Sequence, residues 1–371
     1  MEKTKITLLR ENLLKAVTIA NRFVPLKPSL PVLGNVLLKV QKGSLSVCAT
    51  NLETSAKIDI PAKEERLWEI TVPAKILNEF LATTTGREVT LSVEKEGVLI
   101  RTENAQGSIS GIAASEFPKL PQVGGGEKID FNQKELQEAV NGVAFAASVD
   151  EGKPVLTGIL LKNDGDKTIV VATDGYRLGQ KQLKTKYSLE ETLVGAKTLV
   201  EVLKIASELE EDKIWLSVSE ENNQVIFSGD NFLISGRLLA GTYPNFSQII
   251  PSKFETNLEI NKTALMTAIK SAAVFAQDVG NVVKLEINPK GEIKISANTL
   301  QIGEGEATVS ATVKGNSLKI AFNSRYILDG LSALKNEVVE LNFSGVLSPA
   351  LLRDKDDTSF IHIVMPVKAQ N

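Results

Sequence analysis

The stretch PVLGNVLLK at residues 31–39 returns as PVLTGILLK at residues 154–162, 123 positions further on. Ala49-Thr50 and Ala172-Thr173 keep the same spacing. An apolar triplet with helical spacing occurs three times, as Leu13, Ala16 and Val17, then Leu136, Ala139 and Val140, then Leu265, Ala268 and Ile269. Such self-similarity predicts three tandem copies of one domain. Three copies favour a pseudo-symmetric, curved or ring-forming assembly over an enzyme with one unique active site.

Composition describes a globular protein and excludes several kinds of site. Hydrophobic residues make up 43 % and charged residues 23 % of the 371 residues, and no apolar run is long enough to span a membrane. The chain has one cysteine, Cys48, and one histidine, His362, so it can form neither an internal disulfide nor a Cys/His zinc site. We expect no metal or cofactor and a cytoplasmic protein. The net charge of −3 argues against a nonspecific DNA coat, although basic residues can still gather on one face.

Each copy reads as strand, helix, strands, second helix, strands. The periodicity predicts first helices at residues 10–23, 132–147 and 261–276, and second helices at 73–84, 195–209 and 323–335. Asn132 and Asn261 are expected helix caps, and Pro73 is expected in the first turn of its helix. The fold class is therefore α+β, with helices on one face of antiparallel sheets. Copies joined edge to edge would form one continuous sheet.

The domain boundaries follow from the repeat and from a glycine run. We predict domains at residues 1–123, 127–251 and 252–371, with Gly124-Gly125-Gly126 as a flexible linker. Two other functions remain open at this point. One is a passive repeat scaffold without a ligand, and the other is a hydrolase built on the loop Thr173-Asp174-Gly175. The Asp-Gly pair is also a common turn, and no second acid or base lies beside it.

Five motifs in one order resemble the bacterial DNA polymerase III beta subunit, the sliding clamp. They are VATDGYRL at 171–178, LGN at 33–35, ATNLE at 49–53, YP at 243–244 and VMPVK at 364–368. The resemblance implies a non-catalytic head-to-tail homodimer that encircles duplex DNA without reading its sequence. It also implies partners that include the DNA polymerase III alpha subunit, the clamp loader, other polymerases and repair proteins.

The resemblance places a peptide-binding cleft between the second and third domains. Its lining is expected to be Leu156, Thr173, Gly175, Tyr176, Arg177, Leu178, Pro244, Ile249, Val364, Met365, Pro366 and Val367. Leu156, Leu178 and Ile249 also fit a reading as core residues. The chain departs from the family at Tyr176, where many members have His, at Ser247-Gln248, a pair that is often basic, and at Lys368, where Arg is frequent.

Two further sets of residues come from the same resemblance. Cations expected to face DNA are Arg22, Lys27, Lys75, Lys197, Lys204 and Arg325, and all of them also fit a solvated surface. The apolar positions that match the dimer interface are Ile109, Val274 and Phe275, each of which also fits a core.

Overall fold

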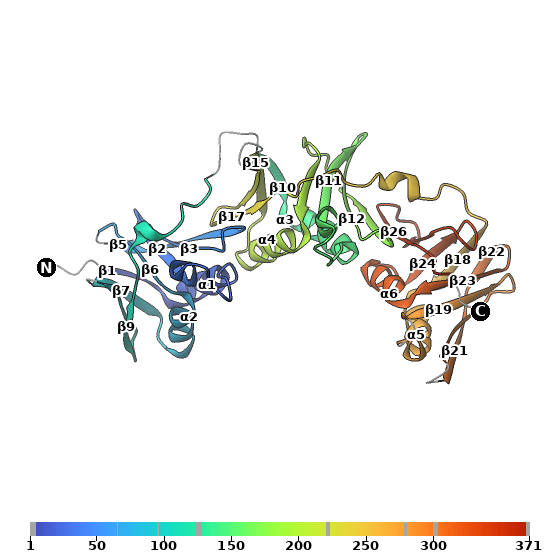
Figure 1. Cartoon of the computed structure of the whole chain (residues 1–371), viewed down its shortest axis with the longest axis horizontal. Coiled ribbons are helices and arrows are strands. Elements are labelled where there is room, and N and C mark those ends of the chain that lie inside the picture. Colours follow the sequence, from blue (N-terminus) through green and yellow to red (C-terminus); the bar gives the residue numbers. More distant parts are fainter. Residues whose placement is uncertain are drawn as a thin grey trace. The chain divides into compact units, whose positions relative to one another are not determined.

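A computed structural model describes residues 5–64, 66–94, 96–122, 128–219, 223–277, 280–299 and 303–368 (Figure 1). The chain divides into two compact units, here unit 1 (Met1–Gln133 with Glu201–Leu238) and unit 2 (Lys134–Val200 with Leu239–Asn371). The expected glycine linker at 124–126 and the last three residues lie outside the described parts of the chain. The predicted domain boundaries stay a prediction.

Unit 1 contains two antiparallel sheets. The first has the order β5-β1-β7-β8-β9, from strands β1 (Lys5–Leu9), β5 (Lys63–Glu64), β7 (Glu88–Glu94), β8 (Gly97–Arg101) and β9 (Gln106–Ser110). The second has the order β10-β15-β16-β17-β4-β3-β2-β6, from β2 (Asn35–Gln41), β3 (Ser44–Thr50), β4 (Ser55–Pro61), β6 (Glu69–Pro73), β10 (Ile129–Asn132), β15 (Lys213–Ser219), β16 (Gln224–Ser228) and β17 (Phe232–Arg237).

Unit 2 also contains two antiparallel sheets. The larger has the order β14-β11-β12-β13-β26-β25-β24-β18-β22, from β11 (Gly158–Asp164), β12 (Lys167–Thr173), β13 (Arg177–Gln182), β14 (Thr192–Gly195), β18 (Thr256–Asn261), β22 (Thr312–Gly315), β24 (Val338–Phe343), β25 (Ala350–Asp354) and β26 (Phe360–Val364). The smaller has the order β21-β20-β19-β23, from β19 (Val282–Asn288), β20 (Glu292–Thr299), β21 (Gly303–Ser310) and β23 (Leu318–Asn323).

The expectation of one continuous sheet is wrong, because the described residues form four sheets. The first copy, for example, contributes strands to both sheets of unit 1. Its strands β2, β3, β4 and β6 lie in the eight-stranded sheet, and its other strands form the five-stranded sheet. The sheets do continue from copy to copy. In unit 1, β4 of the first copy pairs with β17 of the second, and in unit 2, β13 of the second pairs with β26 of the third.

All six predicted helices form, with ends within a few residues of the prediction. They are α1 (Arg10–Asn21), α2 (Ala74–Thr83), α3 (Gln133–Val143), α4 (Ala196–Glu208), α5 (Lys262–Ala273) and α6 (Ser324–Ala333). The first helices of the second and third copies end in short 3-10 turns, Ala144–Ala146 and Val274–Ala276. The Asn261 side chain caps α5 by accepting a bond from the backbone of Ala264, as predicted. Pro73 precedes α2 instead of opening it.

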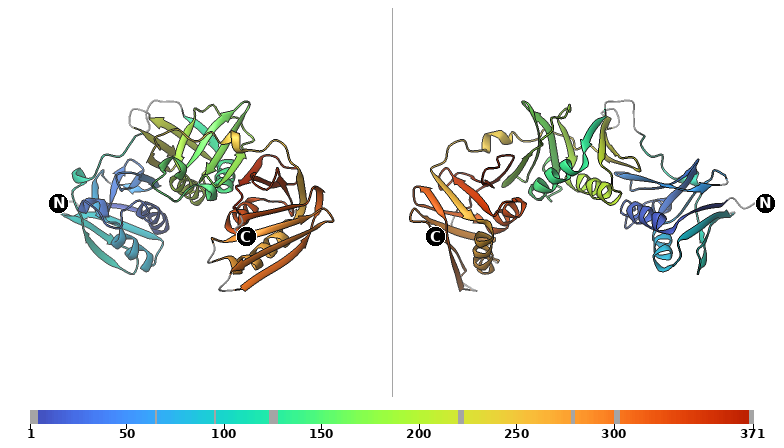
Figure 2. Two further views of the ribbon diagram at one scale, coloured as in Figure 1. Left: turned by 45° about the vertical axis from the view of Figure 1, so that its right-hand side comes forward. Right: turned by 180° about the vertical axis from the view of Figure 1, so that it is seen from behind.

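The first helix of each copy buries the apolar triplet that the sequence predicted. In unit 1, Leu13, Ala16 and Val17 of α1 are buried, and this helix packs on α2, β3 and β4. In unit 2, Leu265 and Ile269 of α5 are buried beside β18, β20 and β21. Figure 2 shows the helices gathered on one side of the strands within each unit. The α+β class with helices on one face of antiparallel sheets is confirmed.

Candidate functional site

Residues 173–178 of unit 2, here called the loop, comprise the end of β12, the turn 174–176 and the start of β13, and their own side chains fix their shape. Asp174 Oδ1 accepts bonds from the backbone nitrogens of Tyr176 at 2.9 Å and Arg177 at 3.0 Å. Thr173 Oγ1 donates to the Arg177 carbonyl, and Gly175 adopts a φ of 91°, which glycine tolerates without steric cost. The Asp174 carboxylate therefore shapes the loop, and the hydrolase hypothesis for Thr173-Asp174-Gly175 has no free acid to work with.

The Arg177 side chain ties this loop to helix α6. Its Nε lies 3.0 Å from Asp174 Oδ2, and its Nη1 donates to Asp329 Oδ2. The guanidinium also stacks over the Tyr326 ring, 4.5 Å from its centroid. Only 13 % of the side chain is exposed. The mostly buried Arg177 side chain therefore connects the loop to α6 and holds the loop in position.

The C-terminal segment lies beside the same loop. Val364 pairs with Arg177 on β13 and with Ala350 on β25, and the Met365 nitrogen donates to the Tyr176 carbonyl at 2.9 Å. The Val367 nitrogen donates to the Ala321 carbonyl of β23 at 2.8 Å, so two backbone bonds hold the segment after β26. The predicted tail and the predicted loop are brought together.

An apolar cluster forms the floor beside the loop. Leu178 and Leu351 pack there with other buried residues, namely Leu160, Ile169, Val171, Leu193, Tyr243, Phe246 and Ile363. Ile249 and Val155 are partly buried against this cluster. Phe246 and Ile249 belong to a short 3-10 turn, Phe246–Ile249, in the segment that connects the second and third copies. This segment therefore packs against the apolar cluster.

The twelve predicted cleft residues divide by exposure. Thr173, Leu178 and Val364 are buried, at 3 %, 0 % and 0 % exposure, which for Leu178 fits the alternative of a core residue. Their strands are paired with neighbouring strands on both sides, and this burial could not be predicted from the sequence. Arg177 is nearly buried as described above. The residues that keep accessible surface are Leu156, Gly175, Tyr176, Pro244, Ile249, Met365, Pro366 and Val367.

Sequence reasoning missed part of this surface. Val346 and Leu347 lie on the loop before β25 and are 55 % and 70 % exposed. Because Ala350 pairs with Val364, this loop lies at the same end of the sheet as the tail. The signal was an apolar pair between the turn residues Gly345 and Ser348. Tyr326 and Asp329, the α6 partners of Arg177, had no signal in the sequence at all.

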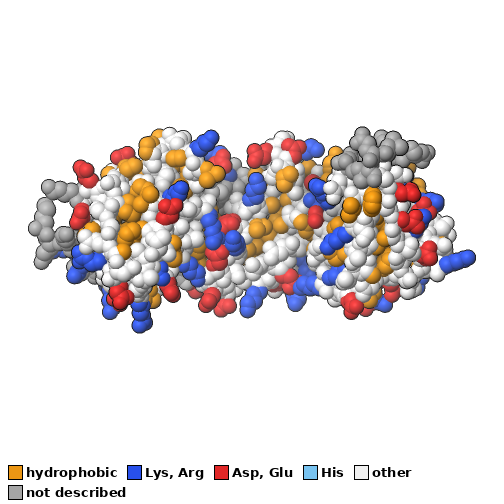
Figure 3. All heavy atoms as spheres, turned by 90° about the horizontal axis from the view of Figure 1, so that it is seen from below, with side chains coloured by type: hydrophobic (Ala, Val, Ile, Leu, Met, Phe, Trp, Pro, Cys, Tyr) orange, Lys and Arg blue, Asp and Glu red, His pale blue; other side chains and the backbone are white. Residues whose placement is uncertain are grey.

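The six predicted DNA-facing cations are all exposed, but they are not equivalent. Arg22, just after α1, lies 2.8 Å from both Glu201 and Glu208, so its charge is largely neutralised within unit 1. Lys75 lies 3.9 Å from Glu79, and both side chains are exposed. Figure 3 shows Lys and Arg interspersed with Asp and Glu on the face that it presents, without one continuous basic patch. The DNA role of these residues stays a prediction.

The three predicted interface residues also differ. Ile109 lies on the edge strand β9 but is only 7 % exposed, because strand alternation turns it inward and its neighbours Ser108 and Ser110 outward. Its side chain packs in the core of its own chain, and its contact with a second chain stays a prediction. Val274 is 55 % exposed, and Phe275 is half-buried. The Phe275 ring lies so close to Gly305 of the edge strand β21 that a Cβ there would come within 2.1 Å of it.

The single histidine is a core residue on the opposite side of the same sheet. Its Nδ1 lies 2.9 Å from the Leu178 carbonyl and its Nε2 3.0 Å from the Tyr326 carbonyl. Burial lowers the pKa of His362 from 6.5 to about 4, although the two carbonyl oxygens favour the charged ring. The imidazole is therefore neutral in the folded chain at neutral pH.

This lowered pKa predicts a loss of stability in mild acid. The unfolded chain takes up a proton on His362 below about pH 6.5 and the folded chain does not, so the free energy of unfolding falls as the pH drops toward 4. Between pH 7 and 5.5 we expect this histidine to cost about 1 kcal/mol, on the order of 1.4 kcal/mol per pH unit. Urea unfolding of the intact chain and of His362→Gln at both pH values measures the difference. Equal losses in both proteins would contradict the prediction.

Profiles of three domains cover nearly all of this chain. The N-terminal, central and C-terminal domains of the DNA polymerase III beta subunit match residues 4–121, 130–245 and 247–368. A curated relative from Synechococcus elongatus, named beta sliding clamp, is 30 % identical over 99 % of this chain and 100 % of its own. The chain belongs to the DNA polymerase III beta subunit family.

Solved structures of the family share the fold over its whole length. The DNA polymerase sliding clamp from Bacillus subtilis is 26 % identical, covers 100 % of both chains and has a TM-score of 0.92. The DnaN sliding clamp from Bartonella birtlesii, solved bound to griselimycin, is 28 % identical, covers 99 % of this chain and 100 % of its own, and has a TM-score of 0.92. The three tandem clamp domains predicted from the repeat are therefore confirmed.

Proposed function

We propose that the chain is a DNA sliding clamp, a non-catalytic ring that encircles duplex DNA and tethers the replicative polymerase to it. The observation that carries the proposal is the family match along the full length, on three tandem copies of one fold. A topological tether needs no reactive groups, and the described residues contain no cluster of three or more His, Cys, Asp or Glu suited to a metal. The described helices also include none long and apolar enough to cross a bilayer. The working compartment in this proposal is the bacterial cytoplasm.

The ring in this proposal forms from two copies joined head to tail. Two edge strands support it, β9 in unit 1 and β21 in unit 2, each paired on one side only among the described residues. Each edge has an aromatic ring packed on a glycine, Phe80 on Gly107 and Phe275 on Gly305. We propose that β9 of one protomer pairs with β21 of its partner, so that backbone bonds carry the contact along the strand that holds Ile109. Val274 and Phe275 would lie at its margin.

The predicted cations act in this proposal as loose phosphate contacts. Lys27, Lys75, Lys197, Lys204 and Arg325 are exposed and can reach phosphates without fixing a sequence. Arg22 would contribute less, because Glu201 and Glu208 already compensate its charge. Contacts of this kind are weak and salt-dependent, which suits a ring that must slide.

The partners in this proposal share one cleft in unit 2. Accessible apolar surface at Leu156, Pro244, Ile249 and Met365 can bury the apolar end of a short peptide. Met365 is flexible and polarisable, which suits several ligands in turn. The ligands would be peptides of the polymerase alpha subunit, the clamp loader, other polymerases and repair proteins. Tyr176, 60 % exposed at the rim, is the residue most able to alter peptide preference.

Retention on circular DNA tests the function. We expect a chain loaded onto nicked circular duplex by a bacterial clamp loader to remain bound in about 0.5 M salt, because topology, unlike phosphate contacts, resists salt. Cutting the circle should release it within minutes. Gel filtration of the DNA fraction with labelled chain measures both, and untreated circles serve as the control. Equal loss from circular and linear DNA would overturn the proposal.

A further inference from the structure

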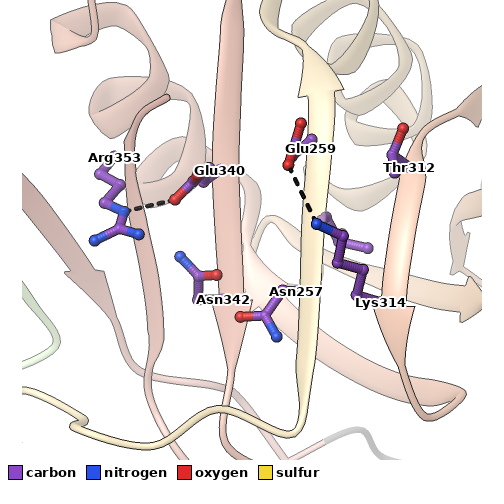
Figure 4. Close-up of a pocket in the computed structure, with 8 residues that line it drawn as sticks. Asn257, Glu259, Thr312, Lys314, Glu340, Asn342 and Arg353 are labelled. Atoms are coloured by element: carbon purple, nitrogen blue, oxygen red, sulfur yellow. Dashed lines mark hydrogen bonds and ion pairs between the residues drawn. The ribbon is translucent and has the colours of Figure 1, made fainter. Parts of the chain in front are cut away.

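A polar hollow of about 200 Å³ lies on the large sheet of unit 2, apart from the cleft (Figure 4). It opens on the face turned away from α5 and α6, because the alternate residues Val339 and Leu341 of β24 point into the core. Four neighbouring strands supply its walls, through Asn257, Leu258, Glu259, Thr312, Lys314, Glu340, Asn342 and Arg353.

The amide of Asn342 lacks a partner in this hollow. Asn342 is 4 % exposed, and its Nδ2 is a buried donor without a hydrogen-bond acceptor among the described residues. Leaving a buried donor unpaired costs about 1–3 kcal/mol, so native proteins rarely keep one without a reason. An acceptor atom brought by a ligand would remove this cost.

The neighbouring guanidinium offers further donors. Arg353 Nε lies 2.6 Å from Glu340 Oε2, a bond that leaves both terminal nitrogens of Arg353 without an acceptor among the described residues. Glu340 and Arg353 are cross-strand partners, and Asn342 is the next residue of β24 on the same face. Figure 4 shows one terminal nitrogen of Arg353 directed to the Asn342 side of the hollow. A planar group with two acceptors, such as a carboxylate, matches this arrangement.

The carboxylates that line the hollow are each paired with a cation. Glu259 is compensated by Lys355 at 2.7 Å and by Lys314 at 3.9 Å, and Glu340 is compensated by Arg353. The charged lining residues therefore balance, with Lys314 and Arg353 against Glu259 and Glu340. A ligand carboxylate would meet no uncompensated negative charge there.

The hollow and the cleft share one row of paired residues on the same face of the sheet. Leu178 pairs with Ile363, Ile363 with Leu351, and Leu351 with Asn342. Asn342 in turn pairs with Asn257, and Asn257 with Lys314. Three strand intervals separate Leu178 from Asn342, a distance of about 14 Å, which an extended peptide covers in about four residues. Tyr243, Phe246 and Phe254 pack in or against the cluster that contains Leu178, Leu351 and Ile363, so a peptide that joins the two places must pass over this cluster.

We propose that this hollow binds an Asp or Glu side chain of the same peptide whose apolar end occupies the cleft. The carboxylate accepts bonds from Asn342 Nδ2 and from the terminal nitrogens of Arg353. The inference rests on the proposed function, since it assigns a second contact to the same ligand. It makes partner recognition bipartite, with an apolar anchor in the cleft and an acidic residue several positions away.

Fluorescence anisotropy with extended peptides tests the inference. The probe is labelled Gln-Leu-Ser-Leu-Phe, extended by Gly-Ser spacers of four, six or eight residues that end in Glu or, as the control, in Gln. One series extends the N-terminal side and the other the C-terminal side. For at least one spacer we expect the Glu peptide to bind the intact chain about fivefold more tightly than its Gln twin, the scale of a partly exposed ion pair.

Substitutions in the hollow test whether it causes the tighter binding of the Glu peptide. Arg353→Gln and, separately, Asn342→Asp should reduce the preference for Glu to less than twofold. The matched control is Lys319→Gln, which removes one exposed cation of β23 outside the hollow and should keep the full preference. Thermal unfolding checks that each variant is folded. If Asn342→Asp does not fold, the Arg353→Gln variant alone tests the inference.

The outcomes separate the two proposals. Equal binding of Glu and Gln peptides at every spacer and on both sides would overturn the inference while leaving the cleft intact, provided the unextended peptide binds. A Glu preference that survives both variants would also overturn it. Failure of the unextended peptide to bind would contradict the cleft itself, and with it this inference.

Discussion

Replacing Gly330 by alanine is expected to destabilise the folded chain by about 3 kcal/mol, at the upper end of what overpacking a buried site costs. Gly330 is buried in α6, and a Cβ built there comes within 2.0 Å of His362 Cδ2 and 2.6 Å of Nε2. The ring cannot move aside cheaply, because it is fully buried and both nitrogens face carbonyl oxygens. The clash outweighs the roughly 0.5–1 kcal/mol that alanine brings to a helix interior. Urea unfolding at fixed protein concentration measures the change.

Two comparisons make the Gly330 result specific. A Cβ added to Gly142, in helix α3, would have its nearest neighbour, the Phe360 ring, 3.9 Å away, so Gly142→Ala should be neutral or stabilise the chain slightly. His362→Ala should relieve the clash, so the double substitution should cost roughly 2 kcal/mol less than the sum of the single ones. A Gly330→Ala protein as stable as the intact chain would show that the helix and ring can separate.

Removing residues 365–371 is expected to abolish binding of the peptide Gln-Leu-Ser-Leu-Phe. The truncation deletes the accessible residues Met365, Pro366 and Val367 and the bond from the Met365 nitrogen to the Tyr176 carbonyl. It thereby removes one wall of the proposed cleft and frees the loop that carries Tyr176. We expect the affinity to fall by at least about tenfold, the loss of roughly 1.4 kcal/mol or more in binding free energy. Fluorescence anisotropy of the labelled peptide measures it.

A shorter truncation is the matched control. A chain that ends at Lys368 keeps every described residue of the tail and should bind the peptide as the intact chain does. Met365→Ala keeps the backbone bond to Tyr176 and removes only the side chain, so it should lose part of the affinity while remaining folded. If the peptide binds the long truncation as tightly as the intact chain, the tail does not line the site.

The internal repeat made most of the fold predictable. Leu13, Ala16 and Val17 mark a buried helical stripe, and the same stripe in two later copies fixes the order of elements. The loop 173–178 even has a counterpart in the first copy, where Asn51 accepts bonds from the backbone of Glu53 and Thr54, and Leu52 takes the left-handed φ of 75°. Short-range periodicity and turn chemistry act within a few residues, so they are readable from the chain alone.

The candidate site was only partly predictable. The motif at 171–178 and the tail at 364–368 identified the right region, and the structure brings them together. Which of these residues stay accessible did not follow from the motifs. Leu178 is buried between β12 and β26, and Val364 is buried between β13 and β25. Val346 and Leu347 were missed because the exposure of a loop depends on the strands around it.

By itself, the sequence determined three copies of one α+β domain, the helices with their buried faces and the family. The tertiary structure alone decided how strands of neighbouring copies share a sheet, as β13 and β26 do, and which partners Arg177 meets. Asp329 lies 152 positions from Arg177 in the chain, and His362 lies 184 positions from the Leu178 carbonyl. Local propensity cannot encode such contacts, because they exist only after distant segments have packed and excluded water from the space between them.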